Sequence, residues 1–261
     1  MEKTRNRSAV LTIKFIFSQS LKTIVTVGNI ITRLKSLGSS ENLTGLEYFG
    51  ITAKKSFGVP TPVLKQFARD LKKQANDRHA LAQELWETRI YDARAVAFMI
   101  DDPTQVTKKQ MDSWAKDFDN WATVDGTCSY LFCRTPFAYE KAFEWAERKP
   151  EFLKRAGFSM MAYLAVHDKK AEDEKLTAFL PVIEKHSYDD RNFVRKAVNW
   201  ALRQIGKRNQ NLNKLAIEAA GRIKLQNTKP ACWIASDALR ELKGEAVVKR
   251  LDRKSLENDP K

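Results

Sequence analysis

Cysteine and histidine are scarce in this chain, with three of each among 261 residues. An odd number of cysteines without metal-like spacing indicates reduced thiols, as is usual in a cytoplasmic protein, which is the location we expect. The sequence also has no H-E-x-x-H, C-x-x-C or glycine-rich phosphate loop. These absences argue against a zinc hydrolase, a P-loop enzyme and a dinucleotide-dependent enzyme, so we expect neither metal nor cofactor.

The chain also lacks an uninterrupted apolar run. Residues 9–31 are rich in aliphatic side chains, but polar and charged residues such as Lys14 and Lys22 interrupt them. This pattern fits neither a membrane-spanning helix nor the core of a signal peptide. We therefore expect no membrane association, and we interpret residues 1–28 as a basic N-terminal extension that either packs on the body or is mobile.

Acidic residues are outnumbered, since 46 Lys and Arg stand against 32 Asp and Glu, for a formal net charge of +14. The excess is concentrated in two places. Residues 1–40 contain seven basic residues and one acidic residue, and residues 191–224 contain nine and one. A positive balance of this size favours a polyanionic partner, although it does not specify a fold.

Strand-like alternation is rare, and helical periodicity with capping signals dominates. A helix is predicted from Thr61, a second over 79–100 with a break near Arg89, and a third from Thr107. Further helices are predicted over 119–132, 136–148, 151–166, 172–186, 190–206, 210–223 and 230–242. Many short helices with short connections predict an all-α fold, an α-solenoid of antiparallel helix pairs with a concave groove. A compact helical bundle is the alternative, because no internal repeat aligns cleanly.

The domain organisation expected from this pattern is simple. One helical-repeat domain covers residues 29–251, and residues 252–261 form a polar C-terminal tail. No heptad seam is present, so we expect a monomer.

Residues 191–208, RNFVRKAVNWALRQIGKR, predict a helix with a tryptophan opposite its apolar stripe. At 100° per residue, one face contains Val194, Val198, Ala201, Leu202 and Ile205, and the other contains Lys196, Trp200, Arg203 and Lys207. An indole among cations suits nucleic acid, because cations meet phosphates while the ring stacks. The alternative is that Trp200 covers a neighbouring helix while the basic side chains extend past it.

A second informative segment is DFDNWATVDGTCSYLF, residues 117–132. Trp121 and Asp125 are four residues apart and share a helix face. Trp121 projects toward the apolar side, so a core tryptophan is the alternative to a functional one. Asp125 lies at the edge of that stripe, where a carboxylate must be hydrogen-bonded, paired with an arginine or used in chemistry. Arg155 lies opposite the apolar stripe of its helix and can reach a phosphate or Asp125, or remain solvated.

Four segments in order resemble the DNA alkylation repair glycosylases built from HEAT-like helical repeats. They are SFGVPTPVLKQFARDL, FDNWATVDGTCSYLF, FLKRAGFSMMAYLAVHDK and RNFVRKAVNWALRQIGKR. The resemblance runs from about Asn29 to Leu251, and no single motif in it is as specific as a zinc signature. It implies a solenoid that holds duplex DNA and hydrolyses the N-glycosidic bond of N3- or N7-alkylated purines in base excision repair.

The resemblance also implies roles for individual residues. Trp121 and Asp125 match a W-D-x-x-D-like segment that supplies an aromatic ring and the catalytic carboxylate, and Trp200 supplies a second indole at the reacting sugar. Arg155, Arg203, Lys196 and Lys207 are expected to hold DNA phosphates, and Tyr48 or Phe49 matches a DNA-facing aromatic. The chain departs from the pattern at Ala122, where an acidic residue often follows the tryptophan.

The mechanism expected from this assignment needs no metal and no general acid. Loss of the base builds positive charge on the sugar, which the carboxylate of Asp125 can stabilise while it orients a water molecule. A purine alkylated at N3 or N7 is already cationic and leaves as a neutral base. Two alternatives remain, a non-catalytic solenoid that recognises distorted DNA and a protein-interaction scaffold with a basic face.

Overall fold

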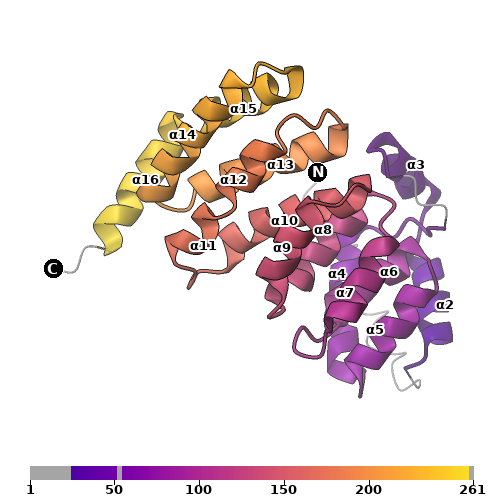
Figure 1. The fold of residues 1–261 in the computed structure, drawn as a ribbon. Coiled ribbons are helices and arrows are strands. Elements are labelled where there is room, and N and C mark those ends of the chain that lie inside the picture. The colour runs from indigo at the N-terminus through magenta and orange to yellow at the C-terminus, as the bar shows by residue number, and fades with distance from the viewer. Residues whose placement is uncertain (1–24, 52–54, 259–261) are drawn as a thin grey trace, which may run out of the picture.

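The computed structural model describes residues 25–51 and 55–258, and no strand occurs within these ranges. The helices follow one another along an elongated, curved stack that runs from α2 to α16 (Figure 1). This arrangement confirms the predicted all-α solenoid. The expectation for residues 1–28 lies largely outside the described residues, and the first described helix begins at Val27.

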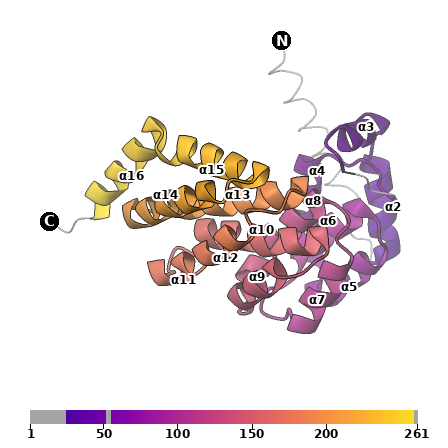
Figure 2. The ribbon, with the colours of Figure 1, turned by 45° about the horizontal axis from the view of Figure 1, so that its top comes forward.

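The stack consists of two layers of helices with one hydrophobic core between them. The first layer, in which each helix packs on the next, contains α4 (Thr61–Gln74), α6 (Tyr91–Ile100), α8 (Trp121–Tyr130), α10 (Glu151–His167), α13 (Asn192–Gly206) and α15 (Lys229–Leu242). The second layer contains α2 (Val27–Leu37), α5 (Arg78–Glu87), α7 (Lys108–Lys116), α9 (Ala138–Ala146), α11 (Asp173–Thr177), α12 (Leu180–Lys185), α14 (Gln210–Leu225) and α16 (Glu245–Asn258). The remaining elements are α3 (Ser40–Tyr48) and the 3₁₀ turn η1 (Phe132–Arg134). The view in Figure 2 shows α15, α13 and α10 in succession, with α12 and α9 beside them.

The turn between α5 and α6 shows how the sequence sets the boundaries of the helices. Arg89 has a φ of 57°, in the left-handed region, which ends one helix before the next begins at Tyr91. The break predicted near Arg89 is therefore confirmed. Asp92, fully buried on α6, accepts hydrogen bonds from the backbone N–H groups of Phe57 (2.6 Å) and Val59 (2.9 Å). These bonds fix the segment that leads into α4.

Two predicted boundaries differ from the structure. The single helix expected over 172–186 is divided into α11 and α12, and Pro181 stands in the first turn of α12. Proline has no backbone N–H to continue a preceding helix, so it favours a new start. At the other end, α16 continues to Asn258, past residue 252, where we expected a polar tail.

The three cysteines, Cys128, Cys133 and Cys232, are free thiols, as the sequence indicated. No helix among the described residues has the length and apolar character needed to cross a membrane.

Candidate nucleic-acid interface

Asp125 of α8 and Arg155 of α10 form a two-point ion pair between adjacent helices of the first layer. Arg155 Nε donates to Asp125 Oδ1 at 3.0 Å, and Nη2 donates to Oδ2 at 2.6 Å. Ser159, one turn along α10, donates to Oδ1 at 2.8 Å, while Arg155 Nη1 donates to the backbone oxygen of Phe193 at 2.8 Å. The side chains of Asp125 and Arg155 are 16% and 8% exposed. The sequence left Arg155 three alternatives: contact with a phosphate, pairing with Asp125, or a solvated side chain. The structure shows the pair with Asp125.

Local sequence features place these two helices. Asn120 caps α8, since its side chain accepts from the backbone N–H of Thr123 at 2.9 Å, and this makes Trp121 the first helical residue. On α10, Gly157 lies against the backbone of α9, where an added Cβ would come within 2.4 Å of the Ala146 nitrogen. Only glycine permits this close approach, which sets the position of α10 and thus of Arg155.

Trp121 is half-buried and does not belong to the core cluster. Its Nε1 donates to the backbone oxygen of Phe49 at 3.0 Å, which joins α8 to the end of α3. The rings of Tyr48 and Phe49 meet edge to face at 5.2 Å and are exposed, with 84% of Tyr48 and 65% of Phe49 open to solvent. The structure therefore brings Trp121 together with both candidate N-terminal aromatics at the surface.

Trp200 is half-buried on α13 and packs against Tyr163 of α10, with ring centroids 4.9 Å apart in an edge-to-face contact. The pKa of Tyr163 is raised, first by burial and then by the negative charge of Asp125. Trp200 thus packs on α10, the helix that also supplies Arg155 and Ser159 to Asp125. The sequence analysis missed both Ser159 and Tyr163, although they follow Arg155 by four and eight residues along one helix face, a spacing that could have indicated them.

The basic residues on α13 and directly after it differ in whether an acidic side chain pairs with them. Arg203 pairs with Glu241 and lies 3.7 Å from Asp237, and Lys207 Nζ lies 2.6 Å from Glu241. Burial raises the pKa of Glu241, but Lys207 and Arg203 outweigh it and hold this pKa below its usual value. Lys196 is exposed, and its ammonium group forms no ion pair within residues 25–51 and 55–258. Of the four cations expected to hold phosphates, Lys196 is therefore the one without an acidic partner.

A further aromatic group on this side was not expected from the sequence. The guanidinium of Arg195 on α13 lies 4.8 Å from the ring centroid of Trp233 on α15, and Trp233 is 39% exposed. An exposed indole stacked on an arginine side chain is a surface on which a nucleic acid base can stack. The described part of the chain contains no grouping of three or more His, Cys, Asp or Glu side chains suited to a metal ion.

A family model described as "DNA alkylation repair enzyme" matches residues 30–242 of this sequence. The chain belongs to the DNA alkylation repair enzyme family. The resemblance carried by the four segments is confirmed, and the matched range covers Trp121, Asp125, Arg155 and Trp200. The family membership by itself does not assign a reaction to these side chains.

One solved structure is similar over nearly all of this family member. It is described as "A new family of proteins related to the HEAT-like repeat DNA glycosylases with affinity for branched DNA structures". The TM-score is 0.72 at 21% sequence identity, over 87% of this chain and 96% of that chain. At this identity the likeness shows the fold alone, and it confirms a HEAT-like architecture. No curated protein matches the chain.

Proposed function

We propose that this protein binds duplex DNA across the first helical layer and hydrolyses the N-glycosidic bond of cationic N3- or N7-alkylated purines. The observation that supports it best is the grouping around Asp125. The carboxylate of Asp125 on α8, one helical turn from Trp121, accepts hydrogen bonds from Arg155 and Ser159 of α10, and Arg155 also donates to the backbone of Phe193 on α13. Three helices, α8, α10 and α13, are thus joined at one partly exposed acid and its arginine partner.

In this proposal, Asp125 is the catalytic carboxylate. A fixed negative charge beside the sugar stabilises the oxocarbenium-like transition state and orients the attacking water. Trp121 and Trp200 supply π faces that favour a cation and exclude other water molecules. Arg155 and Ser159 act as positioning residues, because their hydrogen bonds fix the plane of the carboxylate. The exposed 16% of the Asp125 side chain is the part that substrate can reach.

The DNA backbone would meet the surface on both sides of Asp125. Lys196 offers an unpaired ammonium group on α13, and the exposed rings of Tyr48 and Phe49 lie beside Trp121. Arg203 and Lys207 both pair with Glu241, and Asp237 lies 3.7 Å from Arg203, so DNA phosphates can replace Glu241 as the shared partner of the two cations. Phosphate contacts of this kind predict binding that weakens steeply with salt.

A second candidate function is recognition of distorted or branched DNA without base removal. Two observations favour it. Both carboxylate oxygens of Asp125 already accept hydrogen bonds, and the arginine neutralises much of the charge that catalysis requires. The similar solved structure is described by its affinity for branched DNA. A protein-interaction scaffold is the third possibility, and it predicts no preference for duplex DNA over other polyanions at moderate salt.

The test is release of free base from duplex DNA that contains methylated purines. For the glycosylase, we expect Asp125→Asn to abolish release while DNA affinity changes little, because asparagine keeps the shape but not the charge. Glu84→Gln, an exposed glutamate on α5 in the second layer, is the matched control and is expected to retain release. Binding without any release by the wild-type protein would instead support the second candidate.

A further inference from the structure

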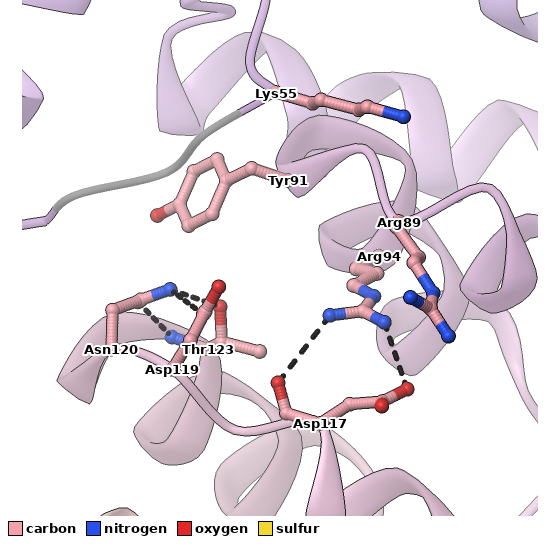
Figure 3. Close-up of a pocket in the computed structure, with 8 residues that line it drawn as sticks. All are labelled: Lys55, Arg89, Tyr91, Arg94, Asp117, Asp119, Asn120 and Thr123. Atoms are coloured by element: carbon pink, nitrogen blue, oxygen red, sulfur yellow. Dashed lines mark hydrogen bonds and ion pairs between the residues drawn. The ribbon is translucent and has the colours of Figure 1, made fainter.

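A pocket of about 340 Å³ opens where α6 meets the beginning of α8, outside the group around Asp125. The side chains that line it are Lys55, Arg89, Tyr91, Arg94, Asp117, Asp119, Asn120 and Thr123. In Figure 3, Lys55 extends across the top, Arg89 lies beside Arg94, and Asp119 and Asn120 lie below the Tyr91 ring. Asn120 caps α8 directly before Trp121, so the pocket adjoins the proposed DNA-binding surface.

The frame of this pocket is fixed by the backbone. The N–H of Tyr91 donates to the carbonyl oxygen of Lys55 at 2.8 Å, which ties the Lys55 backbone to the first turn of α6. Arg89 stands two residues earlier with a φ of 57°, a conformation that costs a non-glycine residue about 1 kcal/mol or more. Both cations are therefore presented from anchored backbone positions.

The charges within the pocket are only partly compensated. Arg94 is satisfied, since it donates to Asp117 at 2.8 Å and to the backbone oxygen of Trp86 at 3.2 Å. The side chains of Lys55 and Arg89 are exposed, and neither has an ion-pair or hydrogen-bond partner within the described ranges. Asp119 is also exposed, and its carboxylate accepts from the Asn120 amide at 2.7 Å.

This distribution of groups restricts the chemistry of a ligand. The cationic ends of Lys55 and Arg89 lie on one side of the pocket, and Asp119 and Asn120 lie on the other. The Tyr91 ring lies on the side of Asp119 and Asn120 (Figure 3). A bare phosphate would be attracted by the cations but repelled by Asp119. A nucleotide has an anionic phosphate, a flat aromatic base and N–H donors on the edge of that base, so it matches all three groups.

We propose that this pocket takes one unpaired nucleotide of a DNA strand that passes Trp121. The phosphate lies between Lys55 and Arg89, the base packs against Tyr91, and an edge of the base donates to Asp119. Guanine fits best, because its Watson–Crick edge offers two adjacent N–H donors to one carboxylate. The inference rests on the proposed DNA binding, and it adds an extrahelical nucleotide that the group around Asp125 does not require.

The experiment compares fully paired duplex DNA with the same duplex carrying one bulged guanine or one bulged thymine, by fluorescence anisotropy at fixed salt. We expect the wild-type protein to bind the duplex with the bulged guanine about tenfold more tightly than the paired duplex. One stacked and hydrogen-bonded base contributes a binding free energy of about this size. The double variant Lys55→Gln/Arg89→Gln should lose this preference and keep its affinity for paired DNA. Asp119→Asn should lose the preference for guanine over thymine.

Lys116→Gln is the matched control, because Lys116 is an exposed cation on α7 that does not line the pocket. It is expected to leave the bulge preference unchanged. Equal weakening of bulged and paired DNA in the double variant would overturn the inference, since the cations would then be general phosphate contacts. Failure of the wild-type protein to bind even the paired duplex would instead contradict the proposed function, and the inference with it.

Discussion

Two arginine–carboxylate groups cross between adjacent helices of the first layer, and they differ mainly in burial. Between α8 and α10, Arg155 and Asp125 are 8% and 16% exposed, and a serine and a backbone oxygen complete the arrangement. Between α13 and α15, Arg203 and Glu241 are 27% and 29% exposed, and Glu241 also serves Lys207.

The difference in burial implies a difference in role. A buried ion pair cannot lose one member cheaply, because the remaining charge stays away from water. A more exposed pair contributes little to stability, and its members can exchange partners. The first group therefore fixes the geometry around Asp125, whereas the second is a reserve of two cations that a DNA phosphate can recruit from Glu241.

The largest expected effect is on stability. Arg155→Ala should lower the free energy of unfolding by about 3 kcal/mol, because it leaves the Asp125 carboxylate unpaired beneath the surface. Arg203→Ala should cost at most about 1 kcal/mol. Urea denaturation of both variants measures the contrast, and equal losses would remove the proposed distinction between the two groups.

A second test disturbs the α8–α10 group without changing its charges. Gly157→Ala should destabilise the protein by about 1–3 kcal/mol, since the added Cβ meets the backbone of α9 and pushes α10 outward. Gly221→Ala on α14 is the control, because no atom lies within 4 Å of its added Cβ. That control should be neutral or stabilising by up to about 1 kcal/mol. Thermal unfolding of the two variants distinguishes them.

A third test releases the cations of the α13–α15 group. Glu241→Gln should increase affinity for duplex DNA at low salt, because Arg203 and Lys207 lose their shared acidic partner. The slope of the logarithm of the binding constant against the logarithm of the salt concentration should steepen. The change should correspond to up to about two additional phosphate contacts. Unchanged affinity and slope would show that Arg203 and Lys207 do not meet DNA.

The smallest effect concerns pH. The folded protein lowers the pKa of Glu241, so this carboxylate stabilises the fold above its unfolded pKa, and the contribution disappears as pH falls through the lowered value. Stability measured from pH 5 down to pH 3 should therefore decline less in Glu241→Gln than in the wild-type protein. An identical decline in both would contradict the assigned pKa shift.

Local sequence signals predicted much of the fold. Capping residues such as Asn120 and the apolar faces of α13 placed most helices correctly, and the turn at Arg89 was visible as a break. The division of α11 from α12 could have been read from Pro181. The sequence analysis predicted no helix over α2, α3 or α16, and α16 was hard to find because its sequence is strongly polar.

The candidate site was only partly visible in the sequence. The spacing of four residues placed Trp121 and Asp125 on one helix face, and the grouping of Trp200 with cations marked α13. The contacts made by these residues come from chain segments 30 to 72 residues away. Nothing in the local pattern of α13 indicates that Glu241, on another helix, neutralises Arg203 and Lys207.

The sequence by itself determined the helices, the positive charge and the residues able to stabilise a cation, because these depend on side-chain identity and on periodicity within one helix. Only the tertiary structure decided which charges remain free. Packing α8 on α10 joins Asp125 to Arg155, and packing α13 on α15 joins Arg203 to Glu241. A charge is available to a ligand only after its neighbours from distant segments have been placed.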